Sequence, residues 1–138
     1  MGKGTEPIKC ESCKRDILTI EEGGLIVQVE NTNTGDISQL YACCDSECYN
    51  YLKELKVGAS EVDTYIDIAE MKNPLLFLQN VINWMEKLHD GVKIEDEAFE
   101  NLKEVIIRSA RFVLRNMTDE EREFAIRVNK ERIDKAIF

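Results

Sequence analysis

A chain of 138 residues, 43% hydrophobic and 33% charged, is long enough for one ordinary domain or for a small domain joined to a second, and its composition excludes a disordered chain. Its net charge of −9 disfavours a broad phosphate-binding surface, because affinity for nucleic acid comes largely from Lys and Arg. The longest apolar run, Leu75–Leu78, is far shorter than the roughly 20 residues that cross a bilayer, and the first residues lack the apolar core of a secretion signal. We therefore expect a cytoplasmic protein that binds other proteins and makes no membrane contact.

The first elements along the chain are predicted to be a β-hairpin and a helix. Residues Leu25–Glu30 and Ile37–Ala42 are rich in strand-forming side chains, and Asn31–Asp36 between them is dense in turn residues. The segment Asp45-Ser46-Glu47 then offers an N-cap for a helix that ends at Gly58.

The cysteines around this hairpin have the spacing of a metal site. Cys10-x-x-Cys13 precedes the hairpin, and Cys43-Cys44-x-x-x-Cys48 follows it at the strand end and the helix start. Four thiolates complete a tetrahedron around Zn²⁺ with Zn–S distances near about 2.3 Å and leave no position for water. We predict one structural zinc ion per chain, bound by Cys10, Cys13, Cys44 and Cys48. Cys43 is the alternative third ligand, disfavoured because C-x₄-C needs a wider turn.

The order of knuckle, hairpin and cysteine pair at a helix start resembles the treble-clef class of zinc fingers. The segment Tyr41–Leu52 is similar to the TRASH/MYM-like members of that class, which carry an aromatic residue, a cysteine, a serine, a second cysteine and an aromatic residue on the helix. The pair Cys44-x-x-x-Cys48 departs from the usual C-x₂-C of the family. The resemblance covers about the N-terminal third of the chain and implies a structural zinc domain, which we place at residues 1–58.

Residues 59–73 are predicted to be a connector or an extra helix. Alternate residues from Val62 to Ile68 follow the period of a strand, whereas Ser60 as an N-cap, with Val62 and Ile66 at helical spacing, favours a helix. We prefer the helix here.

A helical domain is predicted at residues 74–138. Asn73 caps its first helix and Pro74 occupies the first helical position. Two apolar stripes on this helix predict burial over most of its circumference. One stripe contains Leu75, Leu78, Ile82 and Met85, and the other contains Phe77, Val81, Trp84 and Leu88.

Two more helices follow in this prediction. The second runs from about Glu95 to Asn116, and the capping box Thr118–Glu121 opens a third that extends to Ile137. The predicted fold class is therefore α+β, a small treble-clef-like zinc domain followed by a bundle of three to four helices.

The sequence offers no catalytic constellation. It has one histidine, His89, and no recognisable phosphate loop or catalytic carboxylate pair, so we predict no enzymatic activity. The leading prediction is a non-enzymatic interaction, adaptor or regulatory protein whose helical half forms a homodimer or binds a protein partner.

Two alternatives stay open at this point. A nucleic-acid-associated transcriptional regulator would use the zinc finger, with Arg108, Arg111 and Arg115 along one helix face. Glu100 and Glu104 share that face, however, and Glu104 is predicted to pair with Arg108 four residues on. A thiol redox-sensing zinc switch would use Cys43, the cysteine left over from the predicted zinc site.

Overall fold

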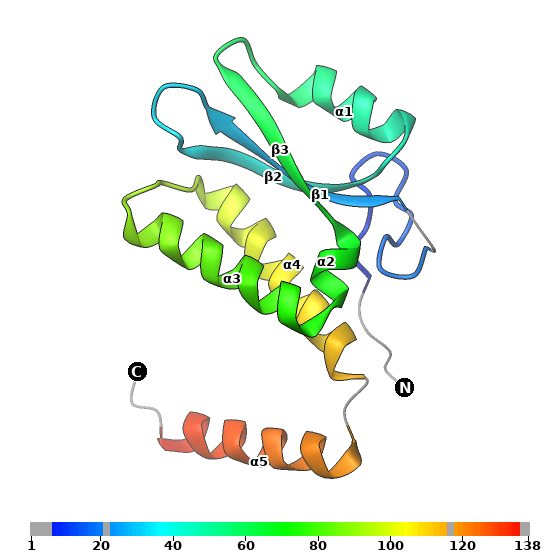
Figure 1. The fold of residues 1–138 in the computed structure, drawn as a ribbon, viewed down its shortest axis with the longest axis vertical. Coiled ribbons are helices and arrows are strands. Elements are labelled where there is room, and N and C mark those ends of the chain that lie inside the picture. Colours follow the sequence, from blue (N-terminus) through cyan, green and yellow to red (C-terminus); the bar gives the residue numbers. More distant parts are fainter. Residues whose placement is uncertain (1–6, 21–22, 116–117, 136–138) are drawn as a thin grey trace.

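A computed structural model describes residues 7–20, 23–115 and 118–135. They form a mixed α/β fold with helices on both faces of one sheet (Figure 1). The antiparallel sheet has the order β2-β1-β3, with β1 at Gly24–Asn31, β2 at Ile37–Cys44 and β3 at Glu61–Asp67. The helices are α1 (Glu47–Lys56), α2 (Ile68–Lys72), α3 (Pro74–His89), α4 (Asp96–Leu114) and α5 (Asp119–Lys135).

The predicted hairpin and the helix after it are confirmed. β1 and β2 pair antiparallel with Val27 opposite Tyr41. The turn forms because the Asn31 side chain accepts hydrogen bonds from the N–H groups of Asn33 and Thr34, and Gly35 adopts a positive φ of 78°. Ser46 caps α1 by accepting a hydrogen bond from the N–H two residues on.

The segment after α1 is a strand, which corrects the helix preferred from the sequence. β3 pairs antiparallel with β1, and Tyr65 lies opposite Val27. Only the last residues, 68–72, form the short helix α2, which begins at the capping carboxylate of Asp67. The strand forms because β1 would otherwise leave a row of N–H and C=O groups unpaired along its second edge.

The core of the molecule lies between the sheet and the helices. On one face of the sheet, Tyr65 packs edge-on against Tyr49 of α1 at a ring-centroid distance of 5.6 Å. On the other face, Gln28 accepts a hydrogen bond of 3.0 Å from the indole N–H of Trp84 in α3. Alternate strand residues thus face α1 or the α3–α4 side, as the pleat requires.

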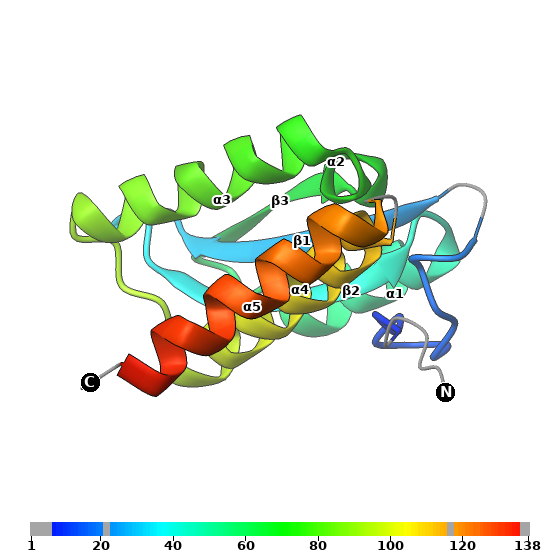
Figure 2. The same ribbon diagram turned by 90° about the horizontal axis from the view of Figure 1, so that it is seen from below.

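Helices α3 and α4 cover the sheet instead of forming a separate bundle. α4 packs on β2, while α2 contacts α3, α4 and β1. Both α3 and α4 lie on the face of the sheet opposite α1 (Figure 1 and Figure 2). Buried side chains from the first loop, the sheet and these helices, such as Ile17, Met71 and Leu102, belong to one cluster. The division of the chain into residues 1–58, 59–73 and 74–138 stays a prediction, and all three parts contribute to this cluster.

Helix α3 begins as predicted but is buried on one side only. The side chain of Asn73 accepts hydrogen bonds from the N–H groups of Leu75 and Leu76. Trp84 is 5% exposed. The predicted burial of most of the circumference is wrong for the single chain, because the sheet, α2 and α4 all lie on one side. The outward stripe is largely exposed: Leu75 63%, Leu78 52%, Ile82 43% and Met85 61%.

Helix α5 begins at the predicted capping box and is set apart from the sheet (Figure 1). The Thr118 N–H donates to the Glu121 carboxylate at 2.9 Å, and the Glu121 N–H donates back to the Thr118 hydroxyl at 3.1 Å. The predicted end of this helix at Ile137 and that of the previous helix at Asn116 lie outside the described residues. Among the helices described, none combines the length and the apolar character needed to cross a bilayer.

Candidate metal centre

The first two cysteines lie on a tight loop, residues 8–18, which we call the knuckle. The Cys10 N–H donates to the Arg15 carbonyl at 2.8 Å, and the Lys14 N–H donates to the Cys10 carbonyl at 2.9 Å. Lys14 has a φ of 67°, a conformation uncommon for a residue with a side chain. The Cys13 N–H points at the Cys10 sulfur at 3.4 Å, so the turn brings both thiols to one side.

The knuckle is attached to the sheet by its backbone and is closed on itself by one carboxylate. The Glu11 N–H donates to the Ala42 carbonyl of β2 at 2.8 Å. Asp16, which the sequence interpretation missed, accepts hydrogen bonds from the N–H groups of Ile8 and Leu18 at 3.2 and 3.0 Å. An Asp that binds the N–H two residues on is an Asx turn, and this local pattern is the signal that could have identified it.

The second pair of cysteines comes from a strand end and a helix start. Cys44 is the last residue of β2, and Cys48 lies in the first turn of α1. Between them the Asp45 N–H donates to the Gly23 carbonyl, and Ser46 caps the helix. The positive end of the helix dipole therefore lies beside the thiols, where it favours the thiolate form.

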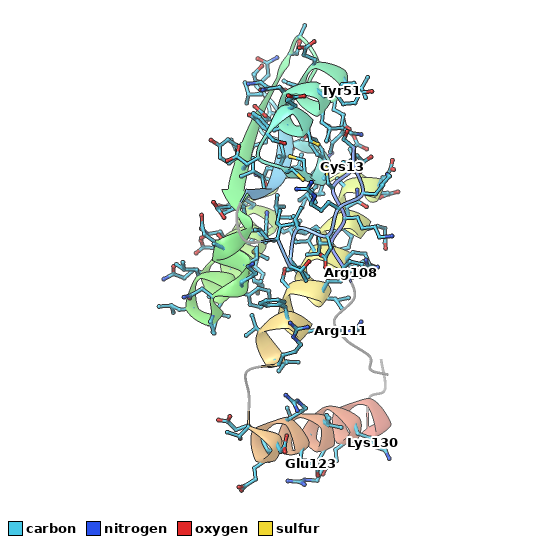
Figure 3. The ribbon with its side chains drawn as sticks, turned by 90° about the vertical axis from the view of Figure 1, so that its right-hand side faces the viewer. Cys13, Tyr51, Arg108, Arg111, Glu123 and Lys130 are labelled. Atoms are coloured by element: carbon cyan, nitrogen blue, oxygen red, sulfur yellow. The ribbon has the colours of Figure 1, made fainter. Side chains whose placement is uncertain are left out.

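The fold brings these four sulfur atoms together. The Sγ atoms of Cys10, Cys13, Cys44 and Cys48 all lie within 4.8 Å of one another, and the Cys13–Cys44 pair is 3.6 Å apart. A tetrahedral ion with metal–sulfur distances of about 2.3 Å holds its sulfurs about 3.8 Å apart, so the cluster can hold a metal ion. Figure 3 shows the sulfur atoms gathered beside Cys13, between the knuckle and α1.

The electrostatics of the cluster also suit a cation. Burial acts to raise the pKa of Cys10, but N–H groups of Cys13, Cys44 and Ser12 outweigh it and lower that pKa to about 7. The pKa of Cys44 is raised to about 12, first by burial and then by the neighbouring thiols, and that of Cys48 is also raised. One thiolate forms readily, whereas several together require a positive ion to offset their repulsion.

Cys43 lies outside this cluster. Its side chain is 0% exposed, and burial raises the pKa of its thiol to about 12. The structure therefore places Cys44, the ligand preferred from the sequence, with the other three sulfurs. Burial of Cys43 within the core cluster makes it an inert apolar side chain in the folded protein.

Separate serine substitutions should distinguish the two neighbouring thiols. Cys44→Ser is expected to lower the bound metal well below one ion per chain, because a hydroxyl does not replace a thiolate ligand. Cys43→Ser should keep one ion while lowering the free energy of unfolding by about 1–3 kcal/mol, since it buries an unpaired hydroxyl. Elemental analysis and urea denaturation measure the two effects. Loss of metal from the Cys43 variant would contradict this assignment.

The arginines considered as anion ligands have internal partners. Arg108 donates to the Pro7 carbonyl at 2.6 Å and to the Glu104 carboxylate at 2.9 Å, so the predicted Glu104–Arg108 pair is confirmed. The Arg115 guanidinium lies 4.8 Å from the ring centroid of Phe112. Arg108 thus ties α4 to the segment that leads into the knuckle.

No protein-family model, curated protein or solved structure matches this chain. The order of knuckle, hairpin and helix is compatible with the treble-clef resemblance, which stays a prediction.

Proposed function

We propose that this chain is a non-enzymatic interaction protein in which a structural zinc ion stabilises the fold and the outward face of α3 binds a protein partner. The observation that carries the proposal is the exposed apolar stripe of Leu75, Leu78, Ile82 and Met85, which we call the outer stripe.

Zinc is the proposed metal because of the donor set. Four thiolates in a tetrahedral arrangement suit zinc or iron, and a closed shell without a water position is typical of structural zinc. The ligands come from the knuckle, the end of β2 and the start of α1, as in a treble-clef finger. The ion would thus fasten the knuckle and α1 to the sheet on which α3 rests.

The outer stripe supports binding of a protein. A monomeric protein rarely exposes a contiguous row of large apolar side chains. The inner side of the same helix is held on the sheet by Trp84 and its hydrogen bond to Gln28, so the outer stripe is presented on a fixed element. A rigid helix face loses little conformational entropy when it binds a partner.

The two alternatives receive less support from the described residues. The chain is acidic, and Arg108 is paired with Glu104 and bonded to the Pro7 carbonyl, which disfavours binding of a phosphate backbone. Oxidation requires an accessible thiolate, whereas Cys43 is buried with a raised pKa.

A site-specific cross-link tests the proposed function. A photoreactive amino acid replaces Gln79, an exposed residue beside the outer stripe, in the full chain expressed in its native cell. The matched control carries it at Glu54, an exposed residue of α1. We expect cross-linked protein at position 79 and not at position 54. Equal or absent cross-linking at both positions would count against an interaction role for α3, and iron in the purified protein would overturn the zinc assignment.

A further inference from the structure

We propose that the partner covering the outer stripe is a second copy of this chain, packed α3 against α3 about a two-fold axis. This proposal rests on the proposed function, because it names the occupant of the same face. Closed two-fold pairing is the commonest way in which soluble proteins bury such a surface.

The spacing of the outer stripe fits a single partner helix. Leu75, Leu78, Ile82 and Met85 are three, four and three residues apart, which is the a/d period of a two-helix seam. Such a stripe is narrow and packs against one other helix at a shallow crossing angle. Trp84, on the opposite side of α3, packs in the core cluster of the same chain. The outer stripe is therefore the side of the helix that is available to a partner.

The exposed area approaches what a stable dimer needs. Leu88, three residues after Met85, extends the outer stripe and is 44% exposed. Five such side chains present on the order of several hundred Å², at the upper end of what a monomer exposes in one patch. Two copies of this surface together approach the roughly 1,000 Å² that a specific interface buries.

The charge distribution favours a second copy at this place. The chain carries a net charge of −9, so two copies repel over most of their surface. In α3, however, the only charged residues are Glu86 and Lys87 near its C-terminal end, and its first turn has no acidic residue. Most of the outer stripe is therefore free of charge. Two copies can meet there with little repulsion, whereas the stripe offers little charge to select an acidic or basic peptide.

The test measures the mass of the intact zinc-loaded chain by light scattering at tens of micromolar. We expect twice the chain mass of 15.9 kDa. Leu78→Glu should weaken the dimer about 100-fold or more, because each copy loses an apolar contact and places a carboxylate in the seam. Leu55→Glu is the matched control, since Leu55 is 66% exposed on α1, and this variant should stay dimeric. Circular dichroism and the fluorescence of buried Trp84 verify that both variants fold.

Several outcomes would overturn the proposal. One is a wild-type monomer at this concentration. Another is a dimer that survives Leu78→Glu but is lost with Phe124→Glu, which would assign the contact to exposed Phe124 of α5. If the wild type is monomeric but position 79 still cross-links to a different protein, the second-copy proposal fails while the proposed function stands. If neither dimer nor cross-link is found, both fail.

Discussion

Removal of the metal by a chelator is expected to cause the largest loss of stability in this protein, and to release the knuckle first. Binding of zinc to four thiolates contributes on the order of 10 kcal/mol in small zinc domains at neutral pH. Apart from the metal, the knuckle is held mainly by the Glu11–Ala42 hydrogen bond, by the ion pair of Glu11 with Lys56 and by the packing of Ile17 and Leu18. At its end, Lys72 donates a hydrogen bond to the Leu18 carbonyl at 3.0 Å. These few contacts are weak beside four metal–thiolate bonds.

Hydrogen exchange with and without chelator measures this effect. Amides of residues 8–18 and of the first turn of α1 should exchange much faster once metal is removed. Amides of α4 should keep more protection, since Leu102 and Val105 remain buried in the shared core. Added zinc should restore the original pattern. An unchanged exchange pattern and thermal midpoint in protein shown to be metal-free would contradict a structural role for the ion.

Trp84→Ala is expected to be the most disruptive single substitution outside the metal centre. Trp84 is the one buried residue of α3, and its indole N–H donates a hydrogen bond to the side chain of Gln28 in β1. Truncation of a buried Trp leaves a cavity and costs about 3–5 kcal/mol of unfolding free energy. It also leaves the side-chain oxygen of Gln28 without this donor.

Urea denaturation followed by circular dichroism measures the loss, and the adjacent residue provides the control. Asn83 is exposed, so Asn83→Ala should change the unfolding free energy by no more than about 0.5 kcal/mol. If Trp84→Ala were no more destabilising than Asn83→Ala, α3 would not depend on this anchor. The contrast between two neighbouring residues separates packing on the sheet from any general effect on helix stability.

Features determined by nearby residues could be predicted from the sequence. The caps at Ser46 and Asn73 and the capping box at Thr118 need only side chains within a few residues of the backbone they bind. The clustering of the four cysteines could also be predicted, because C-x₂-C and the strand-end position of Cys44 restrict where the sulfurs can lie.

Features determined by distant contacts could not be predicted in the same way. The segment around Tyr65 has residues that fit either a strand or a helix, and pairing with β1 decides between them. The composition of α3 showed two apolar sides, but it did not show that the sheet, α2 and α4 would all pack on the Trp84 side. The sequence therefore identified the two apolar stripes of α3, whereas the stripe that the single chain buries depends on where the sheet and the other helices pack.

The attachment of the knuckle has a further consequence for solubility. β2 is an outer strand of the sheet, and the Glu11–Ala42 hydrogen bond covers part of its free edge, while the Asn101 side chain covers another part at Leu40. An uncovered strand edge is a template on which other chains can add strands and aggregate. The proposed zinc ion would fix the knuckle in this position and so also shield the edge of β2 from other molecules. On this proposal, a cell short of zinc would accumulate the protein as aggregate before its helices had unfolded.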